Sequence, residues 1–190
     1  GFAGAAPELV HPADGAGAKA TPIDVPDDAV AVVLHAGDAA APGWRVVYGT
    51  LGGELVARDA HGARVLLRRS SRIAAVALDG RGRWVAAHDG TQVWVVDLAG
   101  TTAPVAIGAY PQPATWLTFA PTGNQLAIGG DDHAITVWQL GTTMPTAAVP
   151  ARALRGHTDA VYGVAFSRGG GRMVSASDDG TARVWNLVTG

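Results

Sequence analysis

Three residue types that hydrolases use for nucleophilic catalysis occur together near the C-terminal end of the sequence. They are His157, Ser175 and Asp179. In a Ser-His-Asp hydrolase the carboxylate orients the imidazole, and the imidazole takes the proton of the serine hydroxyl. Ser175, however, lies in the middle of a strand-like run at 173–177, and no G-x-S-x-G turn is present to expose a nucleophile. The sequence therefore disfavours a hydrolase, and we expect no catalytic residue.

The other polar residues do not indicate a metal or cofactor site. The histidines show no H-x-x-x-H or HExxH spacing, and the sequence has no cysteine. The acidic pairs that begin at Asp131 and Asp178 lack the regular oxygen-ligand loop of a calcium hand. We therefore expect no metal and no cofactor, and we interpret the histidines outside position 157, His88 among them, as turn or solvated residues.

Positive charge is concentrated in one part of the sequence. Within residues 64–83 there are six arginines and one acidic residue, Asp79. Arg68, Arg69 and Arg72 fall in a predicted loop, which could form a basic patch for an acidic peptide, a phosphate or nucleic acid. The alternative is a solvated surface loop. The whole chain carries 14 basic and 16 acidic residues, so a nucleic-acid partner is disfavoured.

Composition and spacing predict the elements that hold these residues. The 190 residues include 26 glycines and 11 prolines, which leave little room for long helices. Short runs rich in β-branched and aromatic residues alternate with Gly, Asp-Gly or Pro turns from Val30 to Trp185, and no ten-residue window has a helical apolar stripe. The apolar runs are far shorter than the ~20 residues of a membrane-spanning helix. We predict an all-β fold and no membrane partner.

The strand pattern repeats. Residues 161–187 read as strand, Gly turn, strand, Asp-Asp turn, and strand ending in Trp, a polar residue and Leu, and residues 114–140 read the same way. Residues 73–98 repeat the plan with one extra residue near Thr91, and residues 30–59 are the most divergent copy. The copies recur about every forty residues, which is the period of a β-propeller blade.

The last copy resembles a WD repeat, the repeat of a β-propeller family. The resemblance is carried by Gly156-His157, by Ser177-Asp-Asp-Gly-Thr181 and by Trp185-Asn186. It implies a β-propeller fold and a structural tetrad of His157, Ser175 (or its neighbour Ser177), Asp179 and Trp185. In such a tetrad the carboxylate fixes the imidazole tautomer, the imidazole engages the hydroxyl, and the hydroxyl accepts from the indole N–H. In place of His157 and Ser175, the second copy has Arg69 and Ala86, and the third has Tyr110 and Ile128. Only the last copy can build the full tetrad, so we expect the other copies to depend mainly on apolar packing.

The repeats divide the chain into a Pro/Gly/Ala-rich linker or lead-in over 1–28 and four blades over 29–190. We place the blades at 29–67, 68–107, 108–150 and 151–190, the last without its outer strand. Four blades are fewer than a WD propeller usually closes with, so we expect a partial ring. The chain could be a fragment whose remaining blades lie on the same or another chain. Alternatively, two copies could form an eight-bladed ring, or Leu9-Val10 or a neighbouring segment could donate the strand that closes a four-bladed ring.

The resemblance implies a non-enzymatic scaffold that binds a protein or peptide through the loop-bearing face of the propeller. Candidate residues on that face are Arg68, Arg69, Arg72, Thr115, Tyr162 and Asp178. The alternative is a sensor or regulatory propeller within a larger bacterial enzyme, such as a signalling NTPase, kinase or protease. The excess of arginine over lysine, with abundant Ala, Gly and Val, is typical of a high-GC genome and predicts a bacterial source. The modest net charge and the lack of cysteine fit a cytoplasmic location.

Overall fold

The computed structural model describes residues 8–11, 19–36, 44–109, 114–121, 125–140 and 149–189. In these ranges the chain forms strands, turns and irregular segments. Four antiparallel sheets follow one another along the chain, with a separate two-stranded sheet at the N-terminal end. The all-β, propeller-type fold predicted from the sequence is therefore confirmed. No described helix is long and apolar enough to cross a membrane.

Each of the four large sheets is one blade. Blade 1 consists of β3 (Ala29–Ala36), β4 (Trp44–Thr50), β5 (Glu54–Asp59) and β6 (Gly62–Arg68). Blade 2 consists of β7 (Ala75–Leu78), β8 (Trp84–His88), β9 (Gln92–Asp97) and β10 (Val105–Ala109). Blade 3 consists of β11 (Ala114–Phe119), β12 (Gln125–Gly130), β13 (Ala134–Gln139) and β14 (Val149–Arg155). Blade 4 has three strands, β15 (Val161–Phe166), β16 (Arg172–Ser177) and β17 (Ala182–Asn186).

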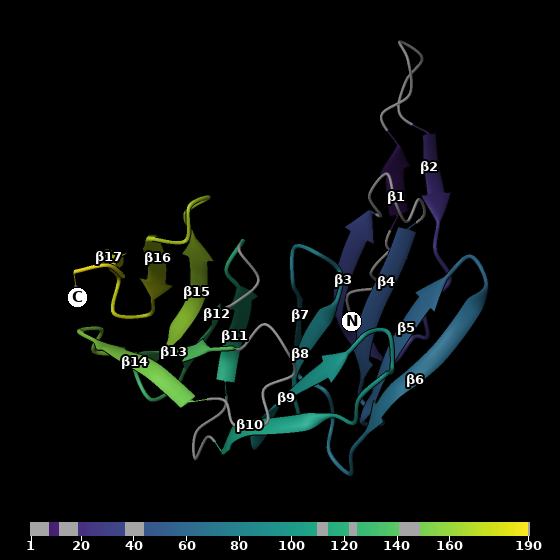
Figure 1. Ribbon diagram of the computed structural model, residues 1–190, viewed down its shortest axis with the longest axis horizontal. Coiled ribbons are helices and arrows are strands. Elements are labelled where there is room, and N and C mark those ends of the chain that lie inside the picture. Colours follow the sequence, from purple (N-terminus) through teal and green to yellow (C-terminus); the bar gives the residue numbers. More distant parts are fainter. Residues whose placement is uncertain are drawn as a thin grey trace.

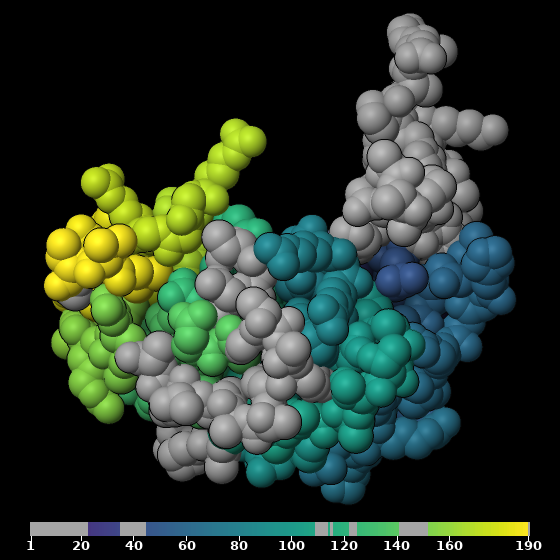
Figure 2. Space-filling model, viewed as in Figure 1, coloured from purple at the N-terminus to yellow at the C-terminus, as the bar shows by residue number. Residues whose placement is uncertain are grey.

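The blades stand side by side in an open arc. The first strand of each blade is the innermost, and β3 contacts β7, β7 contacts β11, and β11 contacts β15. Blade 1 and blade 4 lie at the two ends of this arc (Figure 1). In the space-filling view the C-terminal residues, in yellow, form one margin of the molecule (Figure 2). The ring of sheets is therefore not closed within the described chain.

The hydrophobic core lies between neighbouring blades. Because side chains alternate between the two faces of a strand, each blade has one face toward the preceding blade and one toward the next. Aliphatic and aromatic residues fill the interfaces of blades 1 and 2, blades 2 and 3, and blades 3 and 4. At the first of these, a Cβ on Gly49 would come within 2.4 Å of the Ile73 side chain, so glycine is required for that close approach.

The predicted lead-in contains regular structure. The sequence predicts a linker here, or a strand at Leu9 and Val10 that closes a four-bladed ring. The structure instead pairs Leu9 and Val10 with Thr21 and Ala20, in a separate two-stranded sheet of β1 (Glu8–His11) and β2 (Lys19–Pro22). A four-residue strand with few apolar residues gives no periodicity that sequence reasoning could detect.

Sequence reasoning also missed one strand, β14, whose second residue is Pro150. The predicted boundary between the third and fourth blades, at 150/151, falls inside it. Proline lacks the N–H that a central strand must donate, so a Pro within a run argues against a strand. β14 is the outermost strand of blade 3 and has only one neighbour, β13, so a missing N–H is tolerated there.

Candidate functional site

Four polar side chains form a continuous hydrogen-bonded chain in blade 4. The Nδ1 atom of His157 lies 2.7 Å from Oδ2 of Asp179, and its Nε2 atom lies 2.7 Å from the hydroxyl of Ser175. The indole Nε1–H of Trp185 donates to the same hydroxyl oxygen over 2.8 Å. These partners assign the tautomer: Nδ1–H donates to the carboxylate, and Nε2 accepts from the serine. The structure thus brings together all four residues that the sequence proposed for the tetrad.

Each residue of this chain is positioned by a different element. His157 follows β14, Ser175 lies in β16, Asp179 lies in the turn after β16, and Trp185 lies in β17. Ser177, the alternative serine, instead donates its hydroxyl to the carbonyl of Asp159 and accepts from the N–H of Asp179. These hydrogen bonds therefore hold the loop before β15 and the β16–β17 turn against the sheet.

The Asp179 carboxylate accepts more hydrogen bonds than the tetrad requires. Thr181 donates both its hydroxyl and its backbone N–H to Oδ1, and Thr158 donates its N–H to Oδ2. The hydrogen bond from the Thr181 hydroxyl has the largest effect on the pKa of Asp179. Together with the bonds from His157 and from the backbone of Thr158 and Thr181, it holds this pKa well below its usual range, although desolvation raises it. The carboxylate therefore stays ionised and joins the loop before β15 to the β16–β17 turn.

The same arrangement resembles the relay of a serine hydrolase, but its surroundings do not suit catalysis. Ser175 is only 2% exposed, and its oxygen already accepts the N–H of Trp185. A substrate carbonyl could reach this oxygen only if the indole moved away. The geometry is that of a buried structural network.

Blade 2 contains a different polar network at the corresponding corner. Oδ2 of Asp89 accepts from Nε of Arg69 over 2.8 Å and from the indole N–H of Trp94 over 3.0 Å. The Arg69 guanidinium also lies over the Trp94 ring, 4.4 Å from its centroid. Blade 2, which lacks the full tetrad, therefore has a polar network of its own beside the apolar packing expected for it.

Asp89 is the centre of the blade 2 network. Its side chain is fully buried. Burial raises the pKa of Asp89, but hydrogen bonds from Arg69, from the backbone of Gln92 and Thr91, and from Trp94 outweigh it and hold the pKa well below its usual range. The carboxylate is ionised, and its counter-ion is Arg69.

This network changes the interpretation of the basic loop. Arg69 is neutralised by Asp89, and Arg68 pairs with Glu54. Of the three arginines assigned to the partner-binding face, Arg72 alone has no ion pair with a described residue. The loop that joins β6 to β7 thus presents less free positive charge than its sequence indicates, because the sequence does not reveal which arginines have internal partners.

Two other predicted face residues occupy equivalent places in their blades. The pairing of β11 with β12 is interrupted by a bulge at Thr115, and that of β15 with β16 by a bulge at Tyr162. Tyr162 is 49% exposed, and the negative charge of Asp178 is the main cause that raises its pKa. Asp178 is exposed beside it, whereas the side chain of Thr115 lies outside the described residues. Tyr162 and Asp178 therefore lie together at the loop-bearing end of blade 4.

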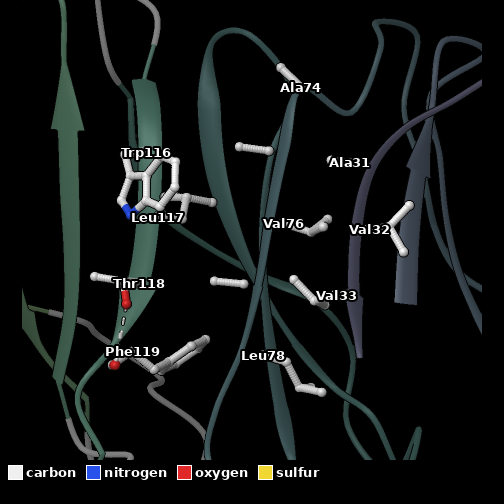
Figure 3. A pocket seen from close by; sticks show the side chains of 12 residues that line it. Ala31, Val32, Val33, Ala74, Val76, Leu78, Trp116, Leu117, Thr118 and Phe119 are labelled. Carbon is white, nitrogen blue, oxygen red and sulfur yellow. Dashed lines mark hydrogen bonds between the residues drawn. The ribbon is translucent and has the colours of Figure 1, made fainter. Parts of the chain in front are cut away.

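A groove of about 450 Å³ runs along the inner strands β3, β7 and β11. Figure 3 shows Trp116 on one side of this groove, Val32 and Val33 on the other, and Val76 and Leu78 between them. Trp116 is 44% exposed, and its indole N–H donates to the carbonyl of Val164 on β15. None of the side chains that line the groove is charged, so the groove offers no group for acid–base chemistry. Sequence reasoning did not single out Trp116, because its exposure depends on the neighbouring bulge.

One histidine does not fit its predicted setting. His88, interpreted as a turn or solvated residue, is the last residue of β8 and is fully buried. Burial lowers the pKa of its imidazole, against the charge of Asp89. Its Nδ1 accepts the backbone N–H of Gly90 over 3.2 Å. Among the residues that the structure describes, no group of three His, Cys, Asp or Glu side chains could hold a metal ion.

Comparison with known proteins matches part of the chain to a repeat family and to several relatives. Residues 108–139 and 148–186 match the family "WD domain, G-beta repeat". A chromatin assembly factor 1 subunit of Gallus gallus is 33% identical over an alignment of 88 residues, which covers 38% of this chain and 16% of that protein. Striatin of Mus musculus is 37% identical over an alignment of 88 residues, which covers 42% of this chain and 11% of that protein. The chain thus spans less than a fifth of the length of these relatives. Both relatives are eukaryotic and do not support the predicted bacterial source.

Proposed function

We propose that this WD-repeat protein is a non-enzymatic scaffold that binds a protein or peptide at the loop-bearing end of its blades. Blades 3 and 4 carry the matched repeats, and the relatives include a subunit of an assembly factor. The observation that carries the proposal is the contrast within blade 4. Its Ser-His-Asp group is buried and fully engaged with Trp185, whereas Tyr162 and Asp178 beside it are exposed.

The buried network supports this role by holding the exposed residues in place. His157 and Asp179 fix the loop before β15 and the turn after β16. Tyr162 follows that loop on β15, and Asp178 lies in that turn. A rigid aromatic side chain at an interface loses little conformational entropy when it binds, so tyrosine is a common anchor in protein interfaces. The expected partner is therefore a protein or peptide that packs against Tyr162.

Affinity capture with matched variants tests this proposal. We expect the Tyr162→Ala/Asp178→Ala variant to recover about tenfold less of the partners bound by the wild-type chain. Arg168→Ala is the matched control, because Arg168 is exposed in the β15–β16 turn at the opposite end of the same blade. Equal losses in both variants, or no loss in either, would contradict the proposed face.

A cytoplasmic location and a bacterial source are parts of the same proposal, supported only by composition. The alternative function, a regulatory propeller within a larger bacterial enzyme, also stays a prediction. Sequencing the intact gene tests it, because a catalytic domain encoded in the same frame would favour the alternative.

A further inference from the structure

The loop that joins β6 to β7 contains two adjacent serines between arginines, in the order Arg68-Arg69-Ser70-Ser71-Arg72. Backbone hydrogen bonds of Arg69 and Ile73 fix the two ends of this loop to the β4–β5 hairpin. Between these ends, residues 70–72 are exposed and form no backbone hydrogen bond with a described residue. The loop thus presents a short tip to solvent, between blades 1 and 2.

Ser70 differs from the other serines of the chain in its hydroxyl group. The sequence has five serines, and all of them lie in the described ranges. The hydroxyl oxygen takes part in a hydrogen bond in Ser71, Ser167, Ser175 and Ser177. The hydroxyl of Ser70 forms no hydrogen bond with a described residue, and Ser70 is exposed. An enzyme can therefore reach and modify this hydroxyl without first breaking an internal bond of the protein.

The arginines around Ser70 indicate which class of enzyme would act on it. Arginine-directed protein kinases recognise arginines that lie two or three residues before the acceptor serine, because carboxylates line their substrate clefts. The sequence by itself favours Ser71, which has Arg69 two residues before it and Arg68 three residues before it. Ser70 has only Arg68 at one of these distances. The choice between the two serines therefore depends on which arginine is available.

The structure leaves Arg68 available and withholds Arg69. Arg69 is bound to the carboxylate of Asp89, whose side chain is fully buried. Arg68 pairs with Glu54, but its own side chain is 71% exposed. An exposed ion pair contributes little to stability, so a kinase carboxylate can replace Glu54, whereas breaking a buried pair leaves a charge without a partner. Ser71 is withheld as well, because its hydroxyl donates to the carbonyl of Asp89 over 2.7 Å.

We propose that Ser70 is a phosphorylation site for an arginine-directed serine/threonine kinase, and that the fold selects it over Ser71. In this reaction the hydroxyl oxygen of Ser70 forms a bond to the γ-phosphorus of a nucleoside triphosphate. The bond from that phosphorus to the bridging oxygen breaks, and the nucleoside diphosphate leaves. The hydroxyl proton passes to the catalytic carboxylate of the kinase. This inference goes beyond the proposed binding function and does not depend on it.

Phosphorylation would reverse the charge of the loop. Arg68 and Arg69 have carboxylate partners, whereas Arg72 has no ion pair with a described residue. The loop thus has one unbalanced positive charge, and a phosphate group adds about two negative charges at neutral pH. The phosphate also supplies acceptor oxygens for the guanidinium of Arg72. The modification would therefore change the loop from a surface that attracts acidic partners to one that attracts basic partners.

An arginine-directed kinase of known specificity tests the proposal on the folded 190-residue chain. The chain is incubated with magnesium ATP and the catalytic subunit of cyclic-AMP-dependent protein kinase, and mass spectrometry maps the product. We expect one phosphate, on Ser70. Ser70→Ala should lower the initial rate about tenfold or more, whereas Ser71→Ala should leave it within about twofold of the wild type. Both variants should fold, because Ser70 has no hydrogen bond to lose and Ser71 has one, in an exposed loop.

Two further measurements test the reason for the choice. A synthetic peptide of residues 64–77 lacks Asp89, so Arg69 and Ser71 are both free in it, and we expect its phosphate mainly on Ser71. In the folded chain, Arg68→Ala should lower the rate of phosphorylation about tenfold, because Arg68 is the arginine that the kinase can reach.

Four results would overturn the proposal. The first is a folded chain that takes up no phosphate, because the loop would then be inaccessible to a kinase. The second is a folded chain whose phosphate lies on Ser71 or on any residue other than Ser70. The third is a wild-type rate of phosphorylation in Ser70→Ala or in Arg68→Ala. The fourth is a peptide phosphorylated mainly at Ser70, because the fold would then have no part in the selection.

Discussion

Blades 2 and 4 fasten the same corner of the sheet with different side chains. In both, an aspartate followed by Gly and Thr occupies the turn before the third strand, and its Oδ1 accepts the hydroxyl and N–H of that threonine. In blade 4 the other oxygen of Asp179 reaches Trp185 through His157 and Ser175. In blade 2 the other oxygen of Asp89 binds Arg69 and Trp94 directly.

The difference follows from the strand register. Ser175 pairs with Arg183, and the corresponding pair in blade 2 is Ala87 with Trp94. Blade 2 thus has no hydroxyl to relay the indole N–H, and its tryptophan lies at the position of Arg183, from which it reaches the carboxylate itself. The comparison shows that the aspartate of the turn is common to both networks. Its partner differs, being Arg69 in blade 2 and His157 in blade 4, and the strand position of the tryptophan differs with it.

The largest expected effect comes from the aspartate of blade 2. Asp89→Asn removes the negative charge that neutralises Arg69, and leaves a half-buried guanidinium with an amide beside it. We expect a loss of about 3 kcal/mol in the free energy of unfolding, because breaking a buried ion pair leaves an uncompensated charge. Urea denaturation of the two proteins measures it. If Asp89→Asn proves as stable as the wild type, the blade 2 network is not a counterpart of the tetrad.

Acid should weaken both networks. The pKa values of Asp89 and Asp179 are lowered in the folded protein, so their contribution to stability is complete above the unfolded value of about 3.9 and is lost as pH falls through the folded values. Unfolding free energies measured between pH 6 and pH 2 should fall steadily below about pH 4. Asp89→Asn should show a shallower fall over the same range, and an identical slope in both proteins would contradict the assigned role of Asp89.

The sequence predicts the blades better than it predicts their contacts. Turn residues and strand composition are local signals, so the four copies and the tetrad at His157, Ser175, Asp179 and Trp185 can be found without coordinates. The ion pair of Arg69 with Asp89 joins residues 20 apart in the sequence, and an aligned arginine in place of histidine gives no sign of it. Sequence alignment places Ala86 at the position of Ser175, and this also hides the different strand position of Trp94. The strand register shows that Ala87 is the counterpart of Ser175.

A smaller effect distinguishes the two serines of blade 4. Ser175→Ala leaves the indole N–H of Trp185 and Nε2 of His157 without a partner in a buried site, which should cost about 2 kcal/mol of unfolding free energy. Ser177→Ala is the matched control, because Ser177 bonds backbone groups near the surface and its loss should cost less than about 1 kcal/mol. The reverse order of the two losses would assign the tetrad to Ser177.

The smallest effect tests whether geometry as well as charge matters in blade 2. Arg69→Lys keeps a positive charge near Asp89, but an ammonium cannot lie flat over Trp94 as the planar guanidinium does. We expect a loss of about 1 kcal/mol, clearly smaller than that of Asp89→Asn, together with a change in the fluorescence of the folded protein where Trp94 contributes. Arg68→Lys is the control, since Arg68 is an exposed residue paired with Glu54 and its replacement should cost less than about 0.5 kcal/mol. If Arg69→Lys and Arg68→Lys are equally stable, positive charge alone explains the role of Arg69. The contact of the guanidinium with the Trp94 ring would then contribute nothing to the free energy of unfolding.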